Sequence, residues 1–119
     1  MAVAEAIDHN VLQGLRESLG GDEEFLVELI QTYFDDSPVQ LVAMEVALAA
    51  GDAESLRRAA HSLKSNSANF GALKLAATCK EVEEMAKAGV LAGAGEKITQ
   101  VAAEYGQARV ALEAIQGGA

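Results

Sequence analysis

The spacing of apolar residues near the C-terminus is the feature that most restricts the fold of this chain. Over positions 98–115 they recur at alternating intervals of three and four residues. This spacing places their side chains on one face of an α-helix, and it is typical of the seam of an antiparallel helical bundle. The residues of this seam are Ile98, Val101, Tyr105, Ala108, Leu112 and Ile115. The sequence therefore predicts a long amphipathic helix that packs against other helices.

The rest of the chain shows similar apolar stripes, bounded by residues that begin or end helices. No segment alternates with a period of two and β-branched residues do not cluster, so no strand is predicted. The connections are short, which favours antiparallel packing of neighbours. The predicted helices cover positions 8–19, 22–36, 38–50, 52–70, 72–88 and 96–115. We therefore expect an all-α fold, an antiparallel four-helix bundle with short extra N-terminal helices, formed by residues 1–119 as a single domain.

Ser37-Pro38 gives the clearest helix start in the sequence. Serine is a favoured N-cap, proline is favoured at the first helical position, and Gln40 completes a capping box. The acidic pair Asp35-Asp36 before it predicts the end of the preceding helix. We therefore expect two separate helices to meet at positions 35–38.

Composition and net charge exclude several classes of function. The chain has 119 residues, a net charge of −9 and a single cysteine, Cys79. An acidic chain is a poor ligand for the phosphate backbone of nucleic acids, and no apolar run is long enough to cross a bilayer. The N-terminal residues lack the pattern of a secretion signal. Because one cysteine cannot form an internal disulfide, we expect a cytoplasmic protein with no nucleic-acid and no membrane partner.

The few cations of this acidic chain are concentrated around one histidine, His61. Residues 1–54 contain 12 acidic residues and one cation, Arg16, whereas residues 55–74 contain four cations and no acid. On a helix, His61 falls opposite the apolar stripe, and three cations at positions i−4, i−3 and i+3 lie within reach of its ring. These cations are Arg57, Arg58 and Lys64. An exposed imidazole among cations is suited to carry a phosphoryl group.

Small residues follow His61 on the same face of the predicted helix. Ser65 and Ala68 lie one and two turns further on and would leave the ring uncovered. The second histidine, His9, falls in the first turn of a predicted helix and is interpreted as an ordinary surface residue. An inert surface role remains the alternative for His61 itself.

Other chemical interpretations have less support. Two distant histidines and one cysteine do not match the ligand spacing of zinc sites. Serines flank His61, but the sequence lacks the strand-turn-helix context of a hydrolase nucleophile. The glycines at positions 89, 93 and 95 lack the Lys-Ser/Thr pair of a phosphate-binding loop. Cys79 lies on an apolar stripe and is predicted to be a small core residue.

Residues 61–72, with the sequence H-S-L-K-S-N-S-A-N-F-G-A, resemble the signature of histidine-containing phosphotransfer (HPt) domains. The family pattern is approximately H-x-L-K-G/S-x-S/A-x-x-L/F-G-A. The resemblance extends to Gly51-Asp52 before the histidine and to Cys79 with the E-V-E-E that follows it, and it covers the chain in helix order and length. Many members have glycine where this chain has Ser65, and we expect this difference to tune the site and to preserve its function.

The resemblance implies a role for each candidate site residue. Members of the family carry a phosphoryl group on the histidine between the aspartates of two receiver domains. A neutral imidazole is the nucleophile, which implies attack by His61 through Nε2, and Lys64 is implied to bind the phosphoryl oxygens. Glu83, on the facing helix, is the candidate partner of the other ring nitrogen, with a solvated surface carboxylate as the alternative. Arg57 and Arg58, placed by the helical wheel, would add longer-range attraction.

The resemblance also implies what the chain lacks and what it binds. We expect no cofactor of its own, because the receiver supplies Mg²⁺, and no autonomous kinase or phosphatase activity. The expected partners are response-regulator receiver domains and hybrid sensor histidine kinases, which the chain would bind as a monomer. We expect them to dock on the rim of the His61 helix and on exposed apolar residues of the preceding helices, with Phe34 and Val42 as candidates. The alternatives are a helical dimerisation module and the phosphorylatable domain of a chemotaxis-type kinase.

Overall fold

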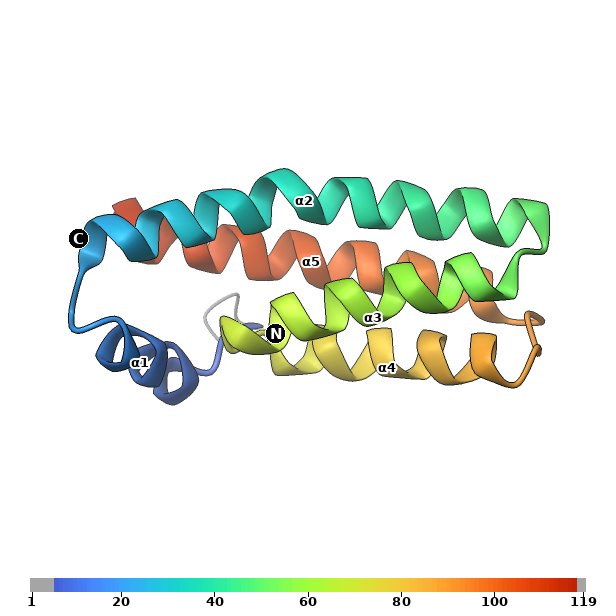
Figure 1. Cartoon of the computed structure of the whole chain (residues 1–119), viewed down its shortest axis with the longest axis horizontal. Coiled ribbons are helices and arrows are strands. Elements are labelled where there is room, and N and C mark those ends of the chain that lie inside the picture. The colour runs from blue at the N-terminus through green and yellow to red at the C-terminus, as the bar shows by residue number, and fades with distance from the viewer. Residues whose placement is uncertain (1–5, 118–119) are drawn as a thin grey trace.

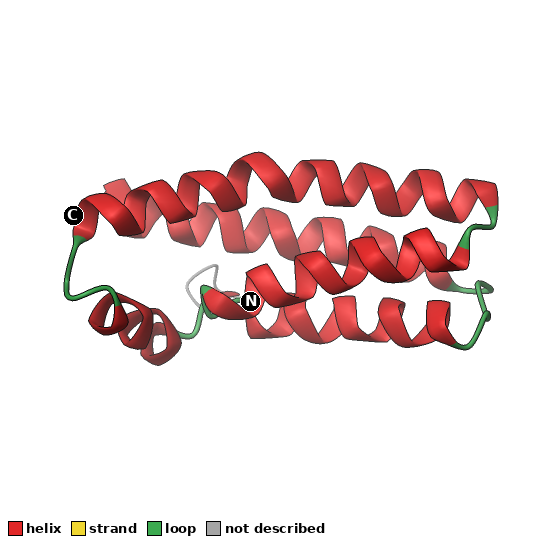
Figure 2. Ribbon diagram, in the orientation of Figure 1, coloured by secondary structure: helices red, strands yellow, loops and turns green. Residues whose placement is uncertain are grey.

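The computed structural model describes residues 6–117 of the chain, with side chains described to residue 115. Its described part contains five helices and no strand (Figures 1 and 2). The helices are α1 (His9–Ser18), α2 (Glu23–Ala50), α3 (Ala53–Asn69), α4 (Leu73–Lys87) and α5 (Ala94–Gly117). The prediction of an all-α fold is confirmed.

Four of these helices form an antiparallel bundle. α3 packs against α2 and α4, and α5 packs against α4 and α2, so that each helix lies beside its neighbours in the chain and the bundle closes between α2 and α5. α1 lies at one end of the bundle, where it contacts α3 (Figure 1). The molecule is 43 Å along its longest axis, close to the length of about 42 Å expected for a straight helix the size of α2. The predicted four-helix bundle with an N-terminal addition is therefore present.

The core follows the apolar stripes of the sequence. Each bundle helix contributes aliphatic side chains that are almost completely removed from solvent, among them Met44, Leu63, Val82 and Leu112. In α5 the seam from Ile98 to Leu112 is buried as its spacing predicts. Burial of such side chains is the main favourable term in the stability of a bundle.

The predicted break at positions 35–38 is wrong, because α2 runs through Pro38 without interruption. Pro38 lies on the solvent-exposed side of α2, where its ring displaces no core contact. The preceding Ser37 is buried, and its hydroxyl donates to the carbonyl oxygen of Tyr33 at 2.6 Å. The buried positions keep one register across the proline. They are Leu26, Ile30, Tyr33, Phe34, Ser37, Met44 and Ala47. Packing of this continuous face outweighs the local preference of Ser-Pro to begin a helix.

The last helix also begins earlier than predicted. α5 starts at Ala94, inside the predicted 89–95 loop, and the Ala94 side chain is completely buried. The dense glycines of this segment favour a loop by propensity alone. Burial of Ala94 against the core favours the helix instead.

The turn between α3 and α4 fixes the start of α1. Gly71 has a φ of 84°, and its carbonyl oxygen accepts a hydrogen bond from the backbone N–H of Asp8 at 2.8 Å. The Asp8 carboxylate then caps α1 by accepting from the N–H groups of Asn10 and Val11. A Cβ atom at Gly71 would lie 2.6 Å from the carbonyl oxygen of Asp8. This close approach explains why a glycine stands there.

Candidate functional site

α3 presents His61 to solvent from the middle of the bundle. The helix begins at an N-cap, Asp52, whose carboxylate accepts from the N–H of Ser55 at 3.0 Å. Leu56 and Leu63 on its inner face are completely buried. His61 lies on the opposite face, and its side chain keeps 54% of its surface exposed. The imidazole is therefore held by a rigid helix and is accessible from water.

Glu83 of α4 joins two of the predicted site residues. Its carboxylate is buried, with a side-chain exposure of 4%, and it reaches across the α3–α4 interface. Oε2 lies 2.8 Å from Nδ1 of His61, and Oε1 accepts a hydrogen bond from Nζ of Lys64 at 2.6 Å. The alternative interpretation of Glu83 as a solvated surface carboxylate therefore does not hold.

The hydrogen bonds at Glu83 determine its charge. Burial alone would raise the pKa of this carboxyl, but the hydrogen bonds from Lys64 and His61 outweigh burial and hold the pKa below its ordinary value. Glu83 is therefore ionised at neutral pH and can only accept hydrogen bonds. In the neutral form of the His61 ring, Nδ1 then carries the proton, which leaves the lone pair on Nε2.

Arg57 and Arg58 do not turn toward His61. Both guanidinium groups pair with the carboxylate of Glu54, one turn earlier on α3. The helical wheel predicted the side of the helix on which the two arginines lie, but it did not predict that Glu54 binds them. Glu54 has the largest effect in raising the pKa of the Arg57 guanidinium, and the negative charge of Glu83 adds a smaller one.

Sequence reasoning missed one cation of the site, Lys87. Its Nζ lies 3.9 Å from Oε2 of Glu83, within ion-pair distance but too far for a hydrogen bond. Lys87 stands four residues after Glu83 on the same helix, and this spacing was the signal that could have identified it. Two neighbouring ion-pair groups, centred on Glu54 and Glu83, thus contain four cations and two carboxylates, so this cluster has a formal charge of +2 in a chain of net charge −9. They are Arg57, Arg58, Lys64 and Lys87, with Glu54 and Glu83.

Comparison with known proteins identifies the family of this chain. A family model described as the Hpt domain matches residues 28–111, which is well over half of the chain. The chain belongs to the Hpt domain family. Its fold is similar to that of the crystal structure of histidine-containing phosphotransfer protein B (HptB) from Pseudomonas aeruginosa PAO1, with a TM-score of 0.88, 37% identity and 96% of each chain covered.

A second relative is Multistep phosphorelay regulator 1 of Schizosaccharomyces pombe. It is 31% identical to this chain over 80 residues, which are 66% of this chain and 27% of that protein. The chain thus spans about a quarter of the length of this relative. Together these likenesses give the Hpt chain a role in histidine phosphotransfer within a phosphorelay.

The Hpt signature separates into exposed and structural positions. His61 and Ser65 are exposed, while Lys64 and Ala68 are half-buried. Leu63, Phe70 and Ala72 belong to the core. Ser67 is also buried, and its hydroxyl shares a hydrogen bond of 2.8 Å with the hydroxyl of Tyr33. The signature therefore encodes the packing of α3 against α2 and α4 as well as the exposed histidine.

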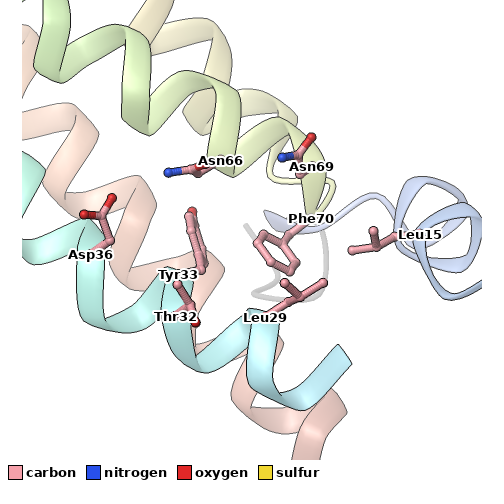
Figure 3. Close-up of a pocket in the computed structure, with 8 residues that line it drawn as sticks. All are labelled: Leu15, Leu29, Thr32, Tyr33, Asp36, Asn66, Asn69 and Phe70. Atoms are coloured by element: carbon pink, nitrogen blue, oxygen red, sulfur yellow. The ribbon is translucent and has the colours of Figure 1, made fainter. Parts of the chain in front are cut away.

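A groove of about 460 Å³ lies between α2 and the C-terminal end of α3, beside α1 (Figure 3). The rings of Tyr33 and Phe70, whose centroids are 4.9 Å apart, lie at its centre. Polar side chains from both helices stand around these rings. The lining residues are Leu15, Leu29, Thr32, Tyr33, Asp36, Asn66, Asn69 and Phe70. His61, Ser65 and Asn69 are spaced four apart on α3, so one ridge of the helix leads from the imidazole to this groove.

The two apolar docking candidates differ in exposure. Phe34 is buried, and its ring packs 4.6 Å from the guanidinium carbon of Arg109, so the prediction that it is an exposed docking residue is wrong. It lies on the α5 side of α2, which the apolar pattern of α2 alone did not resolve. Val42 is 57% exposed, on the outer face of α2 with Val39 and Val46.

Cys79 is completely buried in the core, and burial raises the pKa of its thiol to about 12. Within residues 6–115, no group of three or more His, Cys, Asp or Glu side chains is arranged to hold a metal ion. None of the described helices has the length and apolar character needed to cross a membrane.

Proposed function

We propose that this Hpt chain carries the phosphoryl group on Nε2 of His61, between the aspartates of receiver domains. The observation that carries the proposal is the contact between the exposed imidazole and the buried Glu83 carboxylate. It fixes the ring orientation and keeps the proton on Nδ1, so that the nucleophilic nitrogen faces the partner. Orientation of this kind is the main contribution that a protein makes to phosphoryl transfer.

The proposed step balances without any further reactant. The lone pair of Nε2 forms a bond to phosphorus as the bond between phosphorus and the aspartyl oxygen breaks. The aspartate leaves as a carboxylate with the bonding electron pair. Nδ1 keeps its proton, so the phosphorylated ring is a cation beside the Glu83 carboxylate. Transfer to a second receiver is the reverse reaction with a different aspartate.

Lys64 is proposed to stabilise the phosphoryl group. In this structure its Nζ is bound to Glu83, within the same cluster as the ring of His61. Its position three residues after His61 on one helix lets the ammonium turn from Glu83 toward a group on Nε2. Arg57 and Arg58 are proposed to act at longer range, through the net positive charge of the cluster.

The receiver is proposed to dock over His61 and along the ridge to the groove. Ser65 and Ala68 add little bulk beside the ring, and the Tyr33–Phe70 groove is wide enough for an apolar side chain of the receiver. Val42 is retained only as a peripheral candidate, because it lies on the outer face of α2. The Mg²⁺ and the acidic cluster would come from the receiver, and no cofactor is proposed for this chain.

We further propose that the chain acts as a monomeric carrier in the cytoplasm, with receiver domains and hybrid sensor histidine kinases as partners and no kinase or phosphatase activity of its own. Family membership supports these assignments. A reduced thiol at Cys79 fits a reducing compartment. The proposal that residues 1–119 form one domain is supported by the match over residues 28–111.

The test uses a receiver domain that carries a radiolabelled aspartyl phosphate, with Mg²⁺. We expect the full chain to acquire an acid-labile, alkali-stable label, which is typical of phosphohistidine. A His61→Gln variant should acquire none. His9→Gln is the matched control, because His9 is an exposed histidine on α1, and it should be labelled like the original chain. Label on His61→Gln, with its fold verified by circular dichroism, would end the assignment.

A further inference from the structure

One buried carboxylate of the site, Glu83, has three basic side chains within ion-pair distance. Glu83 binds His61 and Lys64 by hydrogen bonds, and Lys87 stands 3.9 Å from Oε2 without a hydrogen bond to it. Lys87 is 58% exposed, whereas Lys64 is 27% exposed. Lys64 is therefore hydrogen-bonded to Glu83, whereas Lys87 lies close to the same carboxylate without a hydrogen bond.

Phosphorylation of His61 adds a second negative group that competes with Glu83 for these lysines. The phosphoryl group adds about two negative charges at Nε2 and attracts Lys64 away from Oε1 of Glu83. Departure of Lys64 leaves one oxygen of a buried carboxylate without a partner, which is costly in a poorly hydrated position. Arg57 is paired with Glu54 and does not take the place of Lys64.

We propose that Lys87 is a positioning residue, which replaces Lys64 on Glu83 when Lys64 moves to the phosphoryl group. The inference rests on the proposed phosphorylation of His61. Lys87 already lies 3.9 Å from Oε2 of Glu83, and its exposed side chain has room to move toward Oε1, the oxygen that Lys64 leaves. By neutralising Glu83, Lys87 makes the release of Lys64 less costly and shifts the transfer equilibrium toward phosphohistidine. It acts through Glu83 and Lys64 and does not contact the phosphoryl group.

The experiment measures the equilibrium constant for transfer from a phosphorylated receiver domain to the full chain. Lys87→Gln should lower this constant by about two- to fivefold, the range that corresponds to a partly exposed ion pair. Lys87→Arg keeps the charge and should restore it. The matched control is Lys80→Gln, because Lys80 is also an exposed α4 lysine, 3.9 Å from a glutamate at helical spacing, Glu84. It should leave the constant unchanged.

A double-mutant cycle separates this role from direct binding of phosphate. In a Lys64→Ala background, Lys87 pairs with Glu83 both before and after phosphorylation, so Lys87→Gln should no longer change the equilibrium. A lysine that contacts the phosphoryl group directly would keep its effect in that background, and this result would overturn the proposal.

Two further outcomes would also overturn it: an unchanged constant in Lys87→Gln, or an equal loss in Lys80→Gln. Urea unfolding of each variant shows whether a change in stability accompanies the effect, and a positioning role predicts that it does not. If the original chain accepts no label at His61, the proposed function itself fails. If it accepts label normally and Lys87→Gln behaves like the original chain, only the role of Lys87 fails.

Discussion

At the scale of single residues, the site depends on the ionised state of Glu83. The carboxylate is buried, yet its pKa lies below the ordinary value because Lys64 and His61 hydrogen bond to the charged form. Desolvation opposes this charge, and the direction of the pKa shift shows that the hydrogen bonds dominate. A carboxylate can only accept from Nδ1, whereas a protonated Glu83 could donate to it and leave the proton on Nε2.

This balance predicts how stability depends on pH. Because the folded-state pKa of Glu83 is lowered, its contribution is complete above the ordinary glutamate value of about 4.3 and is lost as the pH falls through the lowered pKa. Glu83→Gln should therefore destabilise the chain at pH 7 by about 1 kcal/mol, and this difference should shrink in acid. Urea unfolding at several pH values measures it. Glu84→Gln, at an exposed carboxylate beside Lys80, should show neither effect, and a difference that grows in acid would contradict the assignment.

At the scale of elements, the α3–α4 turn connects the Hpt signature to α1. Gly71 adopts a left-handed conformation and brings its backbone against that of Asp8. The Asp8–Gly71 hydrogen bond fixes where α1 begins. α1 in turn brings Leu15 to the groove beside Tyr33 and Phe70 (Figure 3). One turn of the signature therefore shapes the groove as well as the end of the histidine-bearing helix.

Comparison of Gly71 with Gly89 separates the energy of this contact from the cost of a left-handed backbone. Gly89, after α4, has a φ of 71° and open space within 4 Å of the position that a Cβ would take, whereas a Cβ on Gly71 would meet the Asp8 backbone at 2.6 Å. Gly89→Ala should cost only the left-handed conformation, about 1 kcal/mol. Gly71→Ala should cost about 2–3 kcal/mol, since the backbone of Asp8 must also move. Chemical unfolding compares them, and equal losses would show that the contact with Asp8 carries no energy.

Local sequence predicted the helix ends at glycines better than the junction at Ser37-Pro38. Gly51, Gly71 and Gly89 end helices where expected, because a positive φ is a local property that glycine supplies cheaply. The helix break predicted at Ser37-Pro38 is wrong because the same residues that begin a helix can also lie inside one. The outcome there depends on burial of Tyr33 and Met44 in one register, which is a property of the assembled bundle.

The same contrast between local properties and properties of the assembled bundle applies to the site. Exposure of His61 follows from helical periodicity, so sequence alone could place it. The contact between Lys64 and Glu83 depends on the register of α3 against α4, and the turn of Arg57 toward Glu54 depends on competition between carboxylates. The first of these contacts is not encoded in local spacing. The pairs of Glu54 with Arg57 and Arg58 and of Glu83 with Lys87 do have helical spacing, but spacing alone does not decide which partner each side chain takes.

At the scale of the whole molecule, the charge of the cluster near His61 is opposite in sign to the net charge of the chain. The chain carries a net charge of −9, and the outer face of the first half of α2 exposes Glu24, Glu28 and Asp35. The cluster around His61 nevertheless has a formal charge of +2. At an ionic strength of 0.1 M, charges are screened over about 10 Å, so a docked partner senses the cluster more strongly than the distant acidic face. An acidic receiver site is therefore attracted locally by an acidic protein.

Local attraction of this kind predicts a specific dependence of phosphotransfer on salt. Raising the ionic strength from 0.1 to 1 M shortens the screening length to about 3 Å, which weakens attraction between the cluster and the receiver while leaving the bound geometry unchanged. The KM for the receiver should rise by about threefold or more, with little change in the maximal rate. Arg58→Gln, at a cation whose side chain is 71% exposed, should reduce this salt dependence, and Lys80→Gln should not. A KM that falls with added salt would mean that repulsion from the net charge of −9 dominates docking, because screening would then relieve a barrier.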